Sequence, residues 1–159
     1  MILYLHIVEA KNEPFSRSGS FFFYNFTNIS SQGKLLIMKK TASISIIGSG
    51  KVAKSLVQGY LHAGFPKSSL TVYARSTSAK LSWFQGVVNV ETSYETLGEV
   101  QCIILAVTPG GAQSVLKDIQ LSLPKRRVPV FSFVSTLTVT TIKRLLRIDG
   151  KLVVRGMLN

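Results

Sequence analysis

The stretch from Ser43 to Ala53 constrains the fold of this chain more than any other part of its sequence. It reads Ser-Ile-Ser-Ile-Ile-Gly-Ser-Gly-Lys-Val-Ala, so that a β-branched run leads into a Gly-x-Gly-x-x-Ala turn. Apolar residues then recur at helical spacing from Val52 to Leu61. The pattern predicts a strand, a tight turn and a helix in immediate succession.

That succession is typical of a binding site for the pyrophosphate of a dinucleotide. Gly48 permits the tight turn, Gly50 lacks the Cβ that would hold phosphates away from the backbone, and Ala53 is small enough for the helix to pack against the strand. The start of the helix supplies free N–H groups and the positive end of the helix dipole. Because glycine-rich turns are common, an ordinary strand-to-helix turn is the alternative interpretation.

Strand and helix patterns alternate from residue 41 onwards. We expect strands at 43–47, 69–75, 87–90, 102–107, 128–134 and 152–155, and helices at 51–63, 79–84, 112–121 and 139–146. Gly64 is expected to end the first helix, and Pro109-Gly110-Gly111 to separate a strand from the helix after it. This alternation predicts an α/β fold: a Rossmann-like, doubly wound, mostly parallel sheet with helices on both faces.

Composition excludes several classes of function. No apolar run reaches the length of a membrane span, and the single cysteine, Cys102, lies in an apolar run typical of a buried thiol. His6 and His62 are far apart, so no metal site is predicted and no Ser-His-Asp or Cys-His set can be assembled. We expect a cytoplasmic protein, with the mitochondrion as the alternative compartment.

The net charge of +12 comes from 19 Lys and Arg against seven Asp and Glu. The basic residues are scattered, and 125–127 is their only run of three. Nucleic-acid binders usually concentrate charge on one face and interleave aromatic residues, and no such module is visible. A solvated basic surface, or one suited to a phosphate-rich cofactor, is therefore the preferred interpretation.

The end of the second predicted strand bears on the choice of dinucleotide. NAD-preferring sites usually place Asp or Glu there, to hold the ribose 2′-OH. This chain has Arg75, Ser76 and Thr77 instead, a guanidinium and two hydroxyls that suit a 2′-phosphate. We therefore predict NADP as the cofactor, with NADPH preferred over NADH; the alternative is that Arg75 is an ordinary surface residue.

From about Lys40 to its end the chain resembles the N-terminal coenzyme-binding domain of pyrroline-5-carboxylate reductases and related NADP-dependent oxidoreductase domain proteins. Four stretches carry the likeness: the loop from Ile46 to Ala53, Leu105-Ala106-Val107-Thr108-Pro109, the helix 138–146, and Val-Val-Arg-Gly-Met-Leu-Asn at 153–159. The last stretch is similar to the family's Val-x-Arg-x-Met-Pro-Asn. In the family's Leu-Ala-Val-Lys-Pro, a lysine stands where this chain has Thr108.

The resemblance implies an NADPH-binding domain from an enzyme that reduces a cyclic imine to proline by hydride transfer. It also implies a set of cofactor-binding residues, with no catalytic residue identified: Gly48, Ser49, Gly50, Lys51 and Val52 at the pyrophosphate, Arg75 and Ser76 near the 2′-phosphate, Ser93 where an asparagine is usual, and Ala106, Val107 and Pro109 near the ribose and nicotinamide. Two further residues complete the predicted set: Thr77, for its hydroxyl, and Thr108, at the position of the family's lysine.

Two domain assignments follow. Residues 41–159 are expected to form the NADP-binding domain, and residues 1–40 a poorly ordered extension without an assigned function. The family continues beyond the equivalent of Asn159 into a helical domain that dimerises and lines the imine pocket, so we expect this chain to lack efficient turnover. The alternatives are a non-catalytic NADP-binding sensor or scaffold and, ranked below it, a basic nucleic-acid-binding domain on a Rossmann frame.

Overall fold

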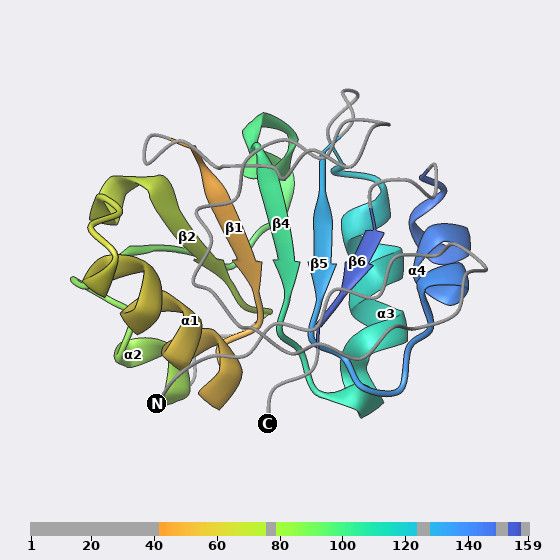
Figure 1. Ribbon diagram of the computed structural model, residues 1–159, viewed down its shortest axis with the longest axis horizontal. Helices are drawn as coiled ribbons and strands as arrows, with labels where there is room; N and C mark the ends of the chain where they lie inside the picture. The colour runs from red at the N-terminus through yellow and green to blue at the C-terminus, as the bar shows by residue number, and fades with distance from the viewer. Residues whose placement is uncertain (1–41, 76–78, 124–127, 149–152, 157–159) are drawn as a thin grey trace, which may run out of the picture.

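The computed structural model of the protein describes residues 42–75, 79–123, 128–148 and 153–156. These residues form one six-stranded sheet in the order β3-β2-β1-β4-β5-β6 (Figure 1). The strands are β1 (Ile44–Ile47), β2 (Leu70–Tyr73), β3 (Asn89–Glu91), β4 (Cys102–Leu105), β5 (Val130–Ser132) and β6 (Val153–Arg155). Every pairing in the sheet is parallel, which confirms the predicted α/β fold.

Most of the strands are shorter than their apolar runs predicted. Single ladder bonds extend beyond the strand ends: the Ala106 amide donates to the Ile47 carbonyl at 2.8 Å, and the Ala74 amide to the Glu91 carbonyl at 3.0 Å. The predicted strands before β5 that are confirmed, and β5 itself, are thus in the right place and too long by one to four residues.

The third strand lies at Asn89–Glu91 and not at the predicted 87–90. Val87 and Val88 belong to a turn, since both of their amides donate to the Phe84 carbonyl. Gly86 adopts a positive φ of 76° within the same turn. The two valines therefore end the connection between α2 and β3, and pairing with β2 begins only at Asn89.

The first helix, α1 (Lys51–His62), buries Ala53, Leu56 and Val57, in agreement with its predicted apolar face. Gly64 ends it with a φ of 82°, a conformation that favours glycine. The Phe65 amide then donates back to the Tyr60 carbonyl at 3.0 Å. The predicted stop signal is confirmed.

The helix after β4, α3 (Pro109–Gln120), begins three residues earlier than predicted. Pro109 occupies its first position, where a fixed φ suits the helix and the missing N–H has no intrahelical partner to lose. Pro-Gly-Gly therefore starts the helix, and the prediction that it separates strand from helix was wrong. The other helices are α2 (Ala79–Ser82), α4 (Val139–Leu146), which matches its prediction, and the unpredicted 3-10 turns Lys67–Ser69 and Glu95–Glu99.

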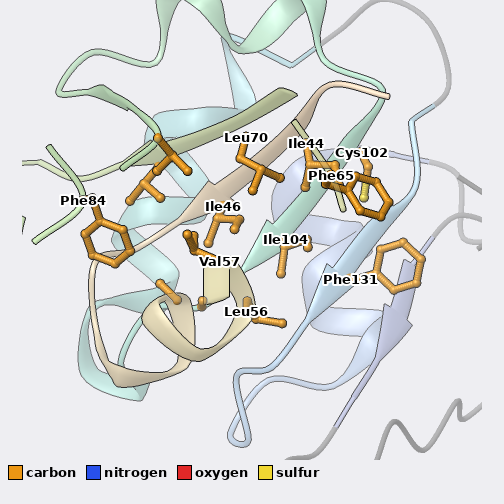
Figure 2. Close-up of a cluster of buried hydrophobic side chains, with 14 of the residues drawn as sticks. Ile44, Ile46, Leu56, Val57, Phe65, Leu70, Phe84, Cys102, Ile104 and Phe131 are labelled. Carbon is orange, nitrogen blue, oxygen red and sulfur yellow. The ribbon is translucent and has the colours of Figure 1, made fainter. Parts of the chain in front are cut away.

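Helices cover both faces of the sheet (Figure 1). On the face that carries α1 and α2, Ile44 and Ile46 of β1 pack with Val57 and Phe84, as Figure 2 shows. On the opposite face, Ile47 packs with residues of α3 and α4. Successive side chains of β1 thus contribute to the hydrophobic clusters on both faces of the sheet, so the sheet lies between the two clusters.

Cys102 is fully buried at the start of β4, as predicted, and burial raises the pKa of its thiol well above the usual range. Within the described ranges, no helix combines the length and the apolar character needed to cross a bilayer. The predicted N-terminal extension, Ser76, Thr77, the basic run 125–127 and residues 157–159 lie outside the described residues.

Candidate functional site

The candidate site lies between the carboxyl ends of β1 and β4, which are neighbours in the sheet. The chain leaves β1 towards the face that α1 covers, and it leaves β4 towards the face that α3 covers. Connections that depart to opposite faces leave a crevice between them, and ligands of doubly wound sheets bind there. The Gly48–Val52 and Ala106–Pro109 segments, predicted as cofactor-binding, form its two sides.

Gly48 is required by the fold itself. Its φ is 116°, and a Cβ added to it would lie 2.5 Å from the Ala106 carbonyl oxygen and 3.2 Å from Val107 Cγ1. Its amide donates to the Tyr73 carbonyl at 2.8 Å. The first glycine of the motif thus allows the turn after β1 to contact the end of β4.

Gly50 differs, because the fold does not require a glycine at its position. Its φ of −83° is open to any residue, and a Cβ added to it would meet no atom within 4 Å. The missing side chain therefore leaves open space beside the start of α1. That space is where a pyrophosphate would have to approach the backbone, so this observation fits a dinucleotide.

The first turn of α1 offers unpaired donors to this space. The first hydrogen bond of the helix joins the Lys54 amide to the Gly50 carbonyl at 3.0 Å, so the amides of Lys51, Val52 and Ala53 have no partner within the helix. Gly50 provides no side-chain cap, and the first turn holds no acidic residue. Such a helix start is suited to binding an anion.

The side chains of this turn divide by burial. Ala53 is fully buried against the sheet and fixes how closely the helix approaches, as its small size predicted. Val52 is partly buried against the same cluster, whereas the ammonium-bearing side chain of Lys51 is exposed. Lys51 thus adds a solvent-exposed positive charge next to the open amides.

The β4 side of the crevice is less polar. Ala106 is 8 % exposed, and Val107 packs partly against the cluster beneath α3. Thr108 is exposed and precedes α3 without capping it through its side chain, and Pro109 follows at the first helical position. The structure therefore brings the predicted residues of both sides together, with donors on one side and apolar contact surface on the other.

Arg75 lies directly beyond the carboxyl end of β2, as predicted, but its guanidinium is engaged. Nη2 of Arg75 lies 3.1 Å from Oδ2 of Asp118 on α3, and each side chain is 46 % exposed. The Arg75 guanidinium also acts on the phenol of Tyr94, a residue that stacks on Tyr73 with 6.0 Å between ring centroids. Burial raises the pKa of the Tyr94 phenol, and Arg75 opposes part of that rise.

Asp118 and Tyr94 escaped the sequence analysis because only the tertiary fold brings α3 and the segment after β3 against the end of β2. A half-exposed ion pair of this kind is weak and exchangeable. Ser93, which precedes Tyr94, is exposed, and its Oγ accepts a hydrogen bond from the Glu95 amide at 3.3 Å. It lies at the end of β3, which β2 separates from β1.

In the described part of the chain, neither His62 nor a metal-binding cluster lies at the crevice. His62 is exposed at the last position of α1, the opposite end of that helix from Gly50. No group of three His, Cys, Asp or Glu side chains that could hold a metal occurs in the described part of the chain. This crevice provides unpaired backbone amides, the open space beside Gly50 and a nearby cation, Lys51.

Residues 43–132 match the family described as NADP oxidoreductase, coenzyme F420-dependent. This match covers both sides of the crevice and the end of β2. No curated protein matches the chain significantly.

Solved structures give a similar result. A pyrroline-5-carboxylate reductase from Coxiella burnetii superimposes with a TM-score of 0.67 at 25% identity, over 74% of this chain and 44% of the reductase. The pyrroline carboxylate reductase of Plasmodium falciparum, solved with NADP bound, gives 0.56 at 22% identity, over 67% of this chain and 38% of that one. Lactate dehydrogenase from Eimeria maxima, solved with NADH and oxamate, gives 0.61 at 9% identity, over 75% of this chain and 44% of that one, a likeness of fold alone. The chain thus spans less than half the length of each.

Proposed function

The chain belongs to the NADP oxidoreductase family that residues 43–132 match, and on that premise we propose that it binds NADP(H) through the crevice between β1 and β4. The similarity to reductases that act on pyrroline-5-carboxylate suggests the reaction class: reduction of a cyclic imine. One observation carries the proposal. Gly50 leaves open space at an uncapped helix start, although its backbone conformation would accept any residue.

In this proposal Gly48 shapes the turn, and Ser49 and Gly50 present their backbone to the pyrophosphate. The amides of Lys51 and Val52 donate to the phosphate oxygens, and the Lys51 ammonium adds charge. We assign the ribose and nicotinamide side to Ala106–Pro109. Contacts with the adenosine side are proposed for Arg75, Ser76, Thr77 and Ser93.

A bound NADPH would supply the hydride for the imine carbon, while the imine nitrogen takes up a proton. The contribution of these residues is to bind and orient the dinucleotide. We retain residues 41–159 as the boundaries of the cofactor domain and 1–40 as an extension without an assigned role.

The test is a titration of the full chain with NADPH and with NADH, followed by nicotinamide fluorescence. Gly50→Val would place a branched side chain in the open space, and we expect it to abolish binding. Gly59→Ala is the matched control. A Cβ at Gly59 also meets no atom within 4 Å, but the residue lies in the middle of α1. We expect Gly59→Ala to bind as the wild type does and to raise the free energy of unfolding by about 1 kcal/mol.

Failure of the folded wild type to bind either nucleotide would overturn the proposal. Equal binding by wild type and Gly50→Val would show that the crevice is not the site. Loss of NADPH absorbance with pyrroline-5-carboxylate would support the reductase assignment. Tight NADPH binding without turnover would instead support the sensor or scaffold alternative.

A further inference from the structure

A second cation, Lys54, lies near the adenosine side of the crevice, in the first turn of α1. Its Nζ lies 4.4 Å from the centroid of the Trp83 ring. Trp83 follows α2, and it packs edge-on against Phe84 with 4.9 Å between ring centroids. Phe84 is 1 % exposed and belongs to the core cluster of Figure 2. The ammonium group is therefore fixed through two aromatic rings to the rigid centre of the domain.

The location of this ammonium group follows from the fold. Side chains of a helix lean towards its N-terminus, so Lys54 extends towards the carboxyl edge of the sheet. Figure 1 shows α2 beside the start of α1 at that same edge, on the face opposite α3. The chain reaches α2 from the end of β2, where doubly wound sheets hold the adenosine ribose of a dinucleotide.

Among the residues that the structure describes, no ion pair of Lys54 with a carboxylate is found. The sequence contains no Asp or Glu from Ala42 to Val90, which includes all of β1, α1, β2 and α2. Arg75, by contrast, has the Asp118 carboxylate at 3.1 Å. A 2′-phosphate would have to displace Asp118 to pair with Arg75, but it would meet at Lys54 a cation held only by an aromatic ring.

We infer that Lys54, positioned by Trp83, recognises the 2′-phosphate of a phosphorylated dinucleotide and decides the preference for NADPH over NADH more than Arg75 does. This inference rests on the proposed function. Trp83 is a positioning residue, since it acts by holding the ammonium group in place.

The test compares two fragments that differ in the 2′-phosphate alone, 2′,5′-ADP and ADP, titrated calorimetrically into the full chain. We expect Lys54→Met to weaken 2′,5′-ADP binding at least about tenfold, the effect of losing one hydrogen bond to a charged group, and to leave ADP binding nearly unchanged. Lys54→Arg should retain most of the difference. Lys67→Met, which removes an exposed charge before β2 at the opposite edge of the sheet, is the matched control and should bind both fragments as the wild type does.

Trp83 provides a second measurement, because it is the only tryptophan of the sequence. Binding of 2′,5′-ADP should change its emission more than binding of ADP does. Trp83→Leu should reproduce the selective loss caused by Lys54→Met, and Trp83→Phe, which keeps an aromatic ring, should restore part of it. A purely structural role for the ring would weaken both fragments equally.

Equal weakening of both fragments by Lys54→Met would overturn the inference. So would a selective loss in Arg75→Met with none in Lys54→Met, while NADPH binding by the wild type would still support the proposed function. If the wild type binds neither NADPH nor the fragments, the proposed function itself fails.

Discussion

The helices α1 and α4 both leave the carboxyl edge of the sheet, but their first turns are completed in different ways. At α4, Thr138 Oγ1 accepts a hydrogen bond from the Thr141 amide at 3.1 Å. At α1, Gly50 occupies the equivalent position and provides no side chain. One helix start is satisfied by its own sequence, and the other is left for water or a ligand. The difference separates a helix start that its own side chain stabilises from one whose amides stay available, as the proposed nucleotide site requires.

Gly48→Ala should destabilise the protein more than the other substitutions do, because it disrupts the turn on which the start of α1 depends. The added Cβ would lie 2.5 Å from a backbone oxygen, at a φ of 116°. We expect a loss of about 3 kcal/mol in the free energy of unfolding, measured by urea denaturation. Gly50→Ala, with open space at its Cβ, should lose far less, and equal losses would contradict the distinction between the two glycines.

Gly50→Asp would convert the start of α1 into one like that of α4. The new carboxylate can cap the helix and interact with its dipole, so unfolding should become harder by about 0.5 kcal/mol. The same charge would repel a pyrophosphate, and NADPH binding should fall at least about a hundredfold. Thermal unfolding and nucleotide titration of one sample measure both effects. A fall in stability together with binding would indicate that the turn had collapsed.

Thr138→Ala has the smallest expected effect of the three substitutions. It removes a helix cap from α4, whereas Gly50→Asp adds one to α1. Removing the cap of α4 should cost about 1 kcal/mol of unfolding free energy, measured by the shift of the urea midpoint. Nucleotide affinity should stay at the wild-type value, since α4 starts beyond β5 and outside the crevice between β1 and β4. A loss of affinity here would mean that the binding site extends across the sheet edge.

Much of the fold could be predicted from the sequence, because the signals are local. The β-branched runs, the helical spacing and the stop at Gly64 each depend on neighbouring residues. Local signals failed where two effects compete for one residue. Pro109 both ends a strand and suits a helix start, and the second effect prevails because the missing N–H has no cost at the first helical position.

The residues of the candidate site also fall into two groups, those that local sequence could predict and those that only the tertiary fold brings together. Gly48 and Gly50 are adjacent enough to form a motif, so their positions at the crevice could be predicted. The ion pair between Arg75 and Asp118, and the contact between Lys54 and Trp83, join elements that only the packing of helices on the sheet brings together. No spacing rule connects such residues, so the electrostatic surroundings of the adenosine side become visible only in the fold.

The burial of Cys102 makes its reaction with a thiol reagent a measure of how often the sheet opens. The single thiol of the chain lies in β4, between β1 and β5, and is inaccessible to any reagent while those strands stay paired. Its rate of alkylation therefore reports how often β4 separates from its neighbouring strands. A nucleotide that bound only the folded protein would lower this rate by a factor of 1 + [L]/Kd, where [L] is its free concentration and Kd its dissociation constant. The alkylation rate of this thiol would therefore report, from the centre of the molecule, the nucleotide binding proposed at the edge of the sheet.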